Sequence, residues 1–223
     1  MNIGLLGFGV VGGGVWALAQ ENRALNVKKV LVRREAPSLG KAAVQDVEAI
    51  LRDTEIDTVV EVLGGLHPAY EWICRALAAG KDVVTANKAV ISAYYRELTA
   101  LARENGVALR CTAAVGGGIP WLVNLQRCRR VDTVTEVGGI MNGTTNFIMD
   151  AMARQGADFP AVLQRAQELG YAEADPSADI DGDDIRRKLT ISANIAFDAL
   201  LREEDIPAFG IRTVTGADVA DFR

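Results

Sequence analysis

The side chains best suited to acid–base chemistry are concentrated in one stretch, EADPSADIDGDDIRRK at residues 173–188. Carboxylates come first, cations follow, and then an apolar run begins, LTISANIAFDALL. Acidic residues are common at a helix N-terminus because the helix dipole is positive there. Asp184 and Lys188 are one turn apart, so a helix would place them on one face. The pair is either a surface salt bridge, which contributes little stability, or a binding carboxylate beside a proton-donating lysine.

A glycine-rich loop near the N-terminus predicts a dinucleotide site. The apolar residues 2–6 read as a strand, and the loop 7–12, GFGVVG, lies between them and a helix pattern. Gly7 allows the tight turn, Gly9 lets the backbone approach a pyrophosphate, and Gly12 lets the helix pack on the strand. Free N–H groups at the helix N-terminus would hold the phosphates. The alternative is a glycine-rich turn without a ligand. The predicted cofactor contacts are Gly7, Phe8, Gly9, Val10, Val11 and Gly12.

The end of the second expected strand bears on the choice of cofactor. Residues 27–33, VKKVLVR, read as a strand and lead into Arg34 and Glu35. NAD-binding versions of this fold usually carry an acid here for the ribose hydroxyls, whereas arginine suits the 2′-phosphate of NADP. Arg33 and Arg34 therefore favour NADP, and Glu35 keeps NAD open. The alternative is that the arginines are solvated loop charges.

Composition and charge exclude several classes of protein. The chain has 223 residues, of which 49% are hydrophobic, enough for one or two domains with a core. A net charge of -5 without a basic tail argues against nucleic acid as the main partner. No apolar run reaches membrane-spanning length. Three scattered cysteines and a lone histidine, His67, predict neither a disulfide framework nor a zinc site. Since the chain opens on a strand and not a signal peptide, we expect a cytoplasmic protein.

Strands and helices alternate in the first part of the chain, which predicts βαβ units and a parallel sheet. Short apolar runs such as TVVEVL suit strands that are buried on both faces. We expect strands near 2–6, 27–33, 57–62, 81–85 and 107–111, and helices near 12–21, 45–52, 68–79 and 90–105.

The pattern changes at the glycines of residues 115–120. Beyond them we expect helices near 121–129, 144–154, 159–169 and 184–201, and a strand over 133–141, where TVTEVGGIM alternates. The predicted fold class is α/β: a Rossmann-type parallel-sheet domain over 1–115, followed by an α+β substrate-binding and dimerisation region over 116–223.

Two further loops follow expected strands. Ligands of open α/β sheets lie beyond the carboxyl ends of the strands, so Lys88 in TANK would point into the cofactor crevice. A surface lysine is the alternative, weakened because a cation at a helix start opposes the dipole. The segment 142–146, NGTTN, follows the expected strand 133–141. By itself it reads as an ordinary helix cap.

Taken together, these segments resemble the homoserine dehydrogenase family. The matching segments occur in order along nearly the whole chain, and the last is highly specific: GFGVVG at 7–12, EVLGG at 61–65, TANK at 85–88, GGIP at 117–120, NGTTNFI at 142–148 and LGYAEADPSADIDGDDIRRK at 169–188. The resemblance implies an NAD(P)-dependent enzyme that interconverts L-aspartate 4-semialdehyde and L-homoserine in threonine and methionine biosynthesis. It also implies a homodimer.

By position, the resemblance assigns roles to single residues. Lys188 matches the proton donor, and Lys88 a lysine near the nicotinamide and the substrate. Chemistry agrees, because hydride transfer to an aldehyde leaves an alkoxide that needs an acid. The substrate's amino group needs a carboxylate partner. The implied amino-acid ligands are Glu173, Asp179 and Asp184, and the further cofactor contacts are Thr85 and Gly170.

Two departures from the family pattern stand out. The family usually has a glutamate at the position of Thr112, where it helps to bind a monovalent cation. The carbonyls of Val115, Gly117 and Ile119 could still bind sodium, but the site should be weak because a hydroxyl replaces a carboxylate. Family members are also considerably longer than this chain.

Two other functions stay open. One is an NADP-binding remnant with little or no activity that serves as a partner subunit, which the short chain favours. The other is a related amino-acid semialdehyde dehydrogenase, which would share the glycine loop but need not share the 173–188 stretch.

Overall fold

A computed structural model describes residues 1–221. The chain divides into two compact units, Met1–Arg130 and Val131–Arg223. Within the described residues, no helix is long and apolar enough to cross a membrane.

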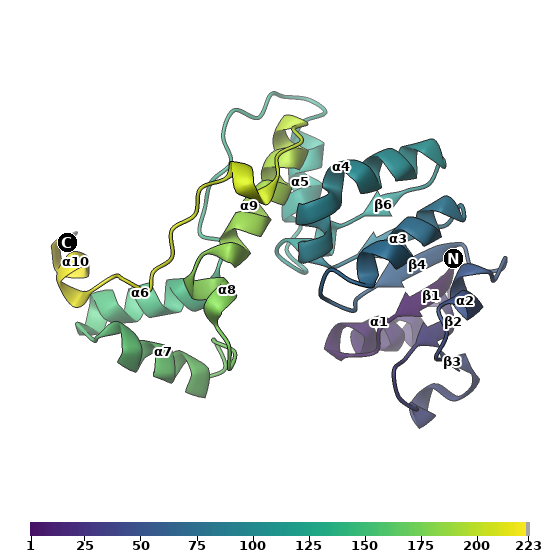
Figure 1. The fold of residues 1–223 in the computed structure, drawn as a ribbon, viewed down its shortest axis with the longest axis horizontal. Coiled ribbons are helices and arrows are strands. Elements are labelled where there is room, and N and C mark those ends of the chain that lie inside the picture. Colours follow the sequence, from purple (N-terminus) through teal and green to yellow (C-terminus); the bar gives the residue numbers. More distant parts are fainter. Residues whose placement is uncertain (222–223) are drawn as a thin grey trace. The chain divides into compact units, whose positions relative to one another are not determined.

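Unit 1 is built on a six-stranded sheet in which every pair of neighbouring strands is parallel (Figure 1). The strand order is β3-β2-β1-β4-β5-β6. This is the order of a Rossmann fold, with the reversal of strand order between β1 and β4. The predicted α/β class is confirmed. The strands are β1 (Asn2–Leu6), β2 (Asn26–Leu31), β3 (Ala43–Val44), β4 (Thr58–Glu61), β5 (Asp82–Thr85) and β6 (Leu109–Arg110).

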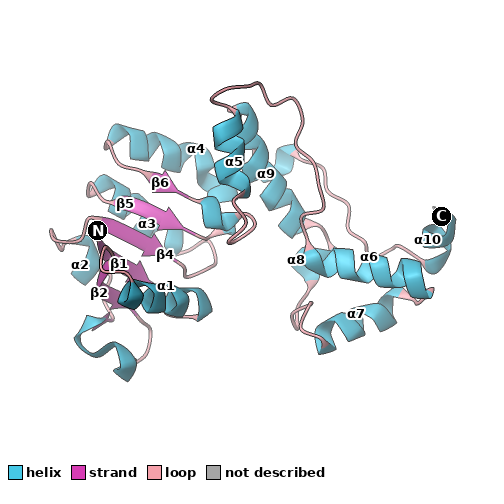
Figure 2. Cartoon of the chain, turned by 180° about the vertical axis from the view of Figure 1, so that it is seen from behind, coloured by secondary structure: helices cyan, strands magenta, loops and turns pink. Residues whose placement is uncertain are grey.

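Helices cover both faces of this sheet, with α1 on one face and α3 and α4 on the other (Figures 1 and 2). The strands are therefore buried on both sides, and Leu5, Val30 and Val59 are fully buried. The helical elements are α1 (Val10–Glu21), α2 (Glu48–Leu51), α3 (Ala69–Ala78), α4 (Lys88–Glu104), α5 (Trp121–Cys128) and the short 3₁₀ turns η1 (Pro37–Ala42) and η2 (Thr112–Ala114).

The helix expected over 45–52 is present but shorter, because α2 covers only Glu48–Leu51. Just before the expected range, Ala43 and Val44 form β3, which was not predicted and pairs with Val30 and Leu31 of β2. The Asp46 carboxylate accepts a hydrogen bond from the Glu48 N–H at 2.9 Å, and α2 begins at Glu48, after this turn. The strand pairing is a long-range contact, and local apolar periodicity does not report it.

In the described part of unit 2, the regular secondary structure is entirely helical. Its elements are α6 (Gly143–Gln155), α7 (Phe159–Glu168), α8 (Ser177–Ile180), α9 (Asp183–Phe197), the 3₁₀ turn η3 (Glu203–Asp205) and α10 (Gly216–Asp221). Its core joins α6, α7 and α8 through Ile148, Met152, Val162 and Ile180. The helix expected to reach residue 201 ends at Phe197, because Asp198 takes the left-handed conformation, with φ of 54°.

The strand expected over 133–141 is wrong, because these residues form an irregular segment. A strand needs a neighbour to accept and donate its backbone hydrogen bonds. Within residues 131–221 no other segment is extended as a strand. The alternating sequence therefore has no partner in this unit.

Candidate active site

The glycine loop forms one wall of a cavity of about 830 Å³ in unit 1. Gly7 has φ of +106°, which a side chain would strain. A Cβ on Gly12 would collide with the Gly7 carbonyl oxygen, so the close packing of α1 on β1 requires glycine. A Cβ on Gly9 would meet no atom within 4 Å, so this position faces open space. Glycine there leaves room for a ligand at the N-terminus of α1, where backbone N–H groups are available.

The charged residues predicted from the end of the second strand also line this cavity. Arg33, Arg34 and Glu35 line the same cavity as Gly7 and Gly9. The structure thus brings together the predicted phosphate loop and the predicted arginines. Val10 and Val11 lie at the start of α1 and are 97% and 55% exposed.

Several other lining residues were not predicted from the sequence, among them Gln45, Pro68 and Trp72. Gln45 follows β3, which was not predicted. Pro68 and Trp72 lie at the start of α3, after the Gly64–Gly65 turn. The glycine pair after the third expected strand was the available signal, since ligands gather at such strand ends.

A buried carboxylate organises the end of the sheet beside this loop. Glu61, the last residue of β4, is fully buried. Its carboxylate accepts hydrogen bonds from the Thr85 hydroxyl at 2.5 Å, the Leu63 N–H at 2.8 Å and the Asn87 side-chain amide at 3.3 Å. Glu61 was also missed, because two of its partners, Thr85 and Asn87, lie at the end of β5 and just beyond it. The Thr85 hydroxyl, a predicted cofactor contact, donates to Glu61.

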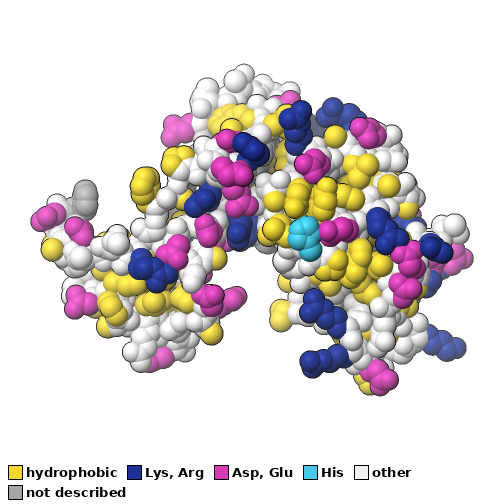
Figure 3. All heavy atoms as spheres, viewed as in Figure 1, with side chains coloured by type: hydrophobic (Ala, Val, Ile, Leu, Met, Phe, Trp, Pro, Cys, Tyr) yellow, Lys and Arg dark blue, Asp and Glu magenta, His cyan; other side chains and the backbone are white. Residues whose placement is uncertain are grey.

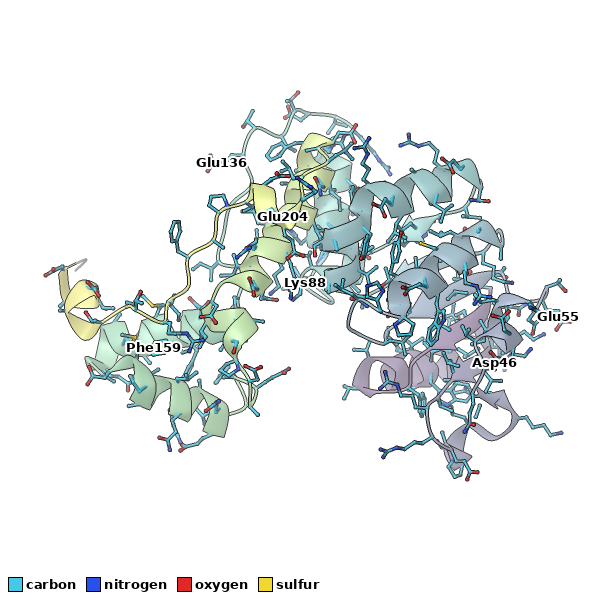
Figure 4. The ribbon with its side chains drawn as sticks, in the orientation of Figure 1. Asp46, Glu55, Lys88, Glu136, Phe159 and Glu204 are labelled. Atoms are coloured by element: carbon cyan, nitrogen blue, oxygen red, sulfur yellow. The ribbon has the colours of Figure 1, made fainter. Side chains whose placement is uncertain are left out.

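Lys88 is the first residue of α4 (Figure 4). The residue before it, Asn87, caps this helix by accepting a hydrogen bond from the Val90 N–H at 3.2 Å, and its amide also donates to the Gly65 carbonyl at 2.7 Å. The backbone at Lys88 is therefore fixed by β4, β5 and α4 together. Its predicted contact with nicotinamide and substrate stays a prediction.

The Asp184–Lys188 pair of unit 2 is not an open surface salt bridge. The Lys188 Nζ lies 2.7 Å from Asp184 Oδ2, and the two side chains are only 18% and 10% exposed. The ammonium also donates to the Met141 carbonyl at 2.6 Å. Burial of a charged pair is costly unless further hydrogen bonds satisfy both groups. The burial and the extra hydrogen bond favour a binding carboxylate beside a proton-donating lysine over a surface salt bridge.

Asn142 connects this pair to a second carboxylate. Its side-chain N–H₂ donates to Asp184 Oδ2 at 2.9 Å and to Asp179 Oδ1 at 2.7 Å. Two of the predicted amino-acid ligands therefore meet the predicted proton donor in one cluster. Asn142 itself was interpreted only as a helix cap from the sequence.

Glu173 and Gly170 lie in the turn that follows α7. Glu173 is exposed, and its backbone carbonyl accepts a hydrogen bond from the Gln167 side chain at 3.2 Å. Within the described residues, no hydrogen bond joins its carboxylate to the cluster of Asp179, Asp184 and Lys188. Gly170 has φ of +78°, so it is needed for the turn itself. Their predicted ligand contacts stay predictions.

The predicted sodium ligands lie between η2 and α5. Val115 is buried, whereas Ile119 is 67% exposed. The Ile119 carbonyl accepts a hydrogen bond from the Trp121 N–H at 2.7 Å. Thr112 begins η2. Within residues 1–221, His, Cys, Asp and Glu side chains form no cluster of three that could hold a metal ion.

The remaining titratable residues of interest are not assembled into a nucleophile. His67 is exposed on unit 1 (cyan in Figure 3), with its Nδ1 2.6 Å from Glu71 Oε1. The cysteines are free, and burial raises the pKa of the Cys111 thiol to about 11. A thiol with such a pKa is protonated near neutral pH and a poor nucleophile.

Two family models match the chain in succession. The model described as "Homoserine dehydrogenase, NAD binding domain" matches residues 7–112, and the model described as "Homoserine dehydrogenase" matches residues 120–223. The homoserine dehydrogenase of a Synechocystis species is 43% identical over 99% of this chain and 54% of its own length. The chain belongs to the homoserine dehydrogenase family. It spans about half the length of the curated relatives it matches.

Solved structures of homoserine dehydrogenases have the same fold. The enzyme from Thiobacillus denitrificans aligns with a TM-score of 0.93 and 40% identity, over 99% of this chain and 54% of that one. A putative homoserine dehydrogenase from Archaeoglobus fulgidus aligns with a TM-score of 0.84 and 32% identity, over 98% of this chain and 75% of that one. A hyperthermophilic archaeal homoserine dehydrogenase in complex with NADPH aligns with a TM-score of 0.77 and 27% identity, over 96% of this chain and 74% of that one.

Proposed function

We propose that this protein interconverts L-aspartate 4-semialdehyde and L-homoserine with NADP(H), as an oxidoreductase of threonine and methionine biosynthesis. Family membership supports the reaction class, and the buried Lys188–Asp184–Asn142 cluster supports the chemistry. We further propose a cytoplasmic homodimer in which residues 1–115 bind the cofactor and residues 116–223 bind the substrate and form the dimer.

Lys188 is the proposed proton donor because of how its ammonium is held. An ammonium has three N–H donors. Two of them are directed to Asp184 and to the Met141 carbonyl at 2.7 and 2.6 Å. These bonds fix the direction of the third N–H, which can reach a substrate oxygen and transfer a proton to a developing alkoxide. In the reverse direction the neutral amine would accept the hydroxyl proton of the alcohol.

Asp179 and Asp184, with Glu173, are the proposed ligands for the substrate's α-ammonium group. A carboxylate that binds a cation must keep acceptor capacity for it. Asp179 meets this condition, since one of its oxygens accepts from Asn142 and a carboxylate has about four lone-pair sites.

NADP is the proposed cofactor, with NAD as the less favoured one. The nicotinamide, when bound, supplies or accepts the hydride. The chain's own part is to bind and orient it: the N-terminus of α1 for the pyrophosphate, Arg33 and Arg34 for a 2′-phosphate, and Thr85, Lys88 and Gly170 as further contacts. Arginine suits the phosphate because its planar fork donates two parallel hydrogen bonds.

The test is reduction of NADP⁺ by the purified 223-residue chain with L-homoserine at alkaline pH, where loss of the product proton is favoured. Formation of NADPH, followed by absorbance, is the expected result, with little formation when L-serine replaces L-homoserine. NADPH binding without any turnover would contradict the proposed function and indicate a nucleotide-binding remnant.

A further inference from the structure

Asn142 joins the hydrogen-bond networks of two different features in unit 2. Its side-chain oxygen accepts from the Thr145 N–H at 2.8 Å and the Thr145 hydroxyl at 3.0 Å, which caps α6. Its side-chain nitrogen donates to Asp179 and Asp184. The residue is only 5% exposed. Both ends of the amide are therefore used.

The cap determines which way the amide faces. Oxygen and nitrogen of an asparagine amide are interchangeable in shape, and the hydrogen-bond partners decide between them. Because the Thr145 N–H is a donor, only the oxygen can face α6. The two N–H donors must then face the carboxylates. The capping of α6 thus directs the two N–H donors of Asn142 to Asp179 on α8 and to Asp184 at the start of α9.

Two carboxylates that share one donor group are held near each other, although like charges repel. Asn142 offsets part of this repulsion and binds each carboxylate through one oxygen. The preceding residue, Met141, supplies the carbonyl that accepts from Lys188. Two adjacent residues, Met141 and Asn142, therefore hold the lysine and the carboxylates.

We infer that Asn142 is a positioning residue, which holds Asp179 and Asp184 in the arrangement that receives the substrate's α-ammonium group beside Lys188. This inference rests on the proposed function and adds a role to a residue that otherwise serves as a helix cap. Asn142 itself carries no charge and transfers no proton.

Two substitutions separate the bridging role from the capping role. Asn142→Ser keeps a good N-cap oxygen for the Thr145 N–H, but its short side chain and single O–H cannot serve both carboxylates. Asn142→Asp also keeps the cap, but replaces the double donor with a third carboxylate. If Asn142 were only a cap, both variants would behave as the wild type does.

The experiment compares the full chain with both variants in three measurements: the KM and kcat for L-homoserine, the Kd for NADPH, and the melting temperature. For Asn142→Ser we expect KM to rise about tenfold, the equivalent of one lost hydrogen bond to a charged group. NADPH affinity should be unchanged, and the melting temperature should fall because two carboxylates lose a donor. Asn142→Asp should raise KM further. An unchanged KM in both variants of an active protein would overturn the inference.

Failure of the proposed function has a different signature. If the wild type shows no turnover, calorimetric titration with L-homoserine replaces the kinetic measurement. Weaker binding to Asn142→Ser than to the wild type then supports the positioning role while the proposed reaction fails. Equal heats in the two proteins, including none in either, overturn the positioning role as well.

Discussion

Burial distinguishes Lys188 from the other cations that pair with acids along a helix. The Arg154–Asp150 pair on α6 has a similar spacing, but its side chains are 78% and 53% exposed. Such exposed pairs contribute roughly 0.3–0.5 kcal/mol to stability. The Lys188 ammonium instead lies between two fixed acceptors, so its position is specified by the protein and not by solvent.

Replacing Lys188 by alanine should lower kcat by roughly 10²–10⁴, the usual range for loss of a general acid. NADPH affinity should be unchanged, because the glycine loop belongs to unit 1. Steady-state kinetics and a separate NADPH titration measure the two effects. Arg154→Ala is the matched control and should leave both unchanged. Near-normal turnover in Lys188→Ala would reject the catalytic role.

Asp184→Ala should mainly raise KM for L-homoserine.

Arg33 and Arg34 are expected to determine the choice between the two nicotinamide cofactors. Wild type should bind NADPH more tightly than NADH, and Arg33→Ala should weaken NADPH binding by about tenfold or more, the cost of a hydrogen bond between charged groups. NADH binding should change little. Fluorescence titration measures both. Arg23→Ala, an exposed arginine outside the cavity lining, is the control. Equal affinity of the wild type for both cofactors would contradict the idea.

At the scale of elements, the first and fourth strands are joined by a carboxylate at the end opposite the glycine loop. Asp57 accepts hydrogen bonds from the Asn2 N–H at 2.9 Å and from the Thr58 hydroxyl at 2.7 Å. The Asn2 N–H is the main reason that the pKa of Asp57 lies below its ordinary value. Since protonation would weaken both bonds, the folded state holds this proton less tightly than the unfolded state does.

This shift predicts part of the acid sensitivity of unit 1. A carboxylate with a lowered folded pKa stabilises the fold above the unfolded pKa of about 4, and that contribution is lost as the pH falls through the folded value. Asp57→Asn should lower the melting temperature at neutral pH and reduce its fall below about pH 4. Circular dichroism at a series of pH values measures this. Glu21→Gln, an exposed carboxylate on α1, is the control. Parallel curves for Asp57→Asn and wild type would rule out the contribution.

The loop between η2 and α5 carries the predicted cation site, and its weakness is assigned to Thr112. Carbonyl oxygens alone supply no negative charge, whereas hard cations favour sites with carboxylates. Thr112→Glu should therefore make melting temperature or activity depend more strongly on sodium than in the wild type, with potassium and choline chloride at equal ionic strength as controls. Identical sodium responses in the two proteins would refute the role of position 112.

The sequence identified elements where local pattern and tertiary structure agree. The local apolar pattern correctly predicted strands β1, β4 and β5 and helices α1, α4 and α9. It failed where a distant partner decides: Ala43 and Val44 pair with β2, and residues 133–141 have no strand partner in the described part of their unit. The functional residues divide in the same way. Lys188 and Asp184 share one helix and were predicted from the sequence. Glu61 and Asn142 were not, because Glu61 bonds to Thr85, 24 positions away, and Asn142 bonds to Asp179, 37 positions away.

At the scale of the whole molecule, the boundary between the two compact units lies later in the sequence than the boundary between the two proposed functional domains. Unit 1 ends at residue 130 of the sequence, whereas the proposed cofactor-binding domain ends at residue 115. Helix α5 accounts for the difference, because it packs against η2 and so joins unit 1. The first family model ends at residue 112, where η2 begins, and the second begins at residue 120, just before α5.

The segment 133–141 bears on the assembly of whole molecules. It alternates as a strand does, yet unit 2 offers it no strand partner within the described residues. Ile140 near its end and Val131 just before it are 83% and 88% exposed. A segment with a strand-like sequence and exposed apolar side chains favours pairing with a second copy, and two-fold dimers are the commonest assembly of identical chains.

We therefore expect the purified chain to be a dimer at micromolar concentration. A charge placed in the pairing segment should oppose it, so Ile140→Asp should raise the dimer dissociation constant, because an aspartate buried in an apolar contact loses its hydration. Val10→Asp replaces a valine that is 97% exposed at the start of α1 and is the control for a new surface charge. Sedimentation equilibrium measures all three proteins. A wild-type monomer would exclude the homodimer, and a dimer equally weakened by both substitutions would exclude residues 133–141 as its interface.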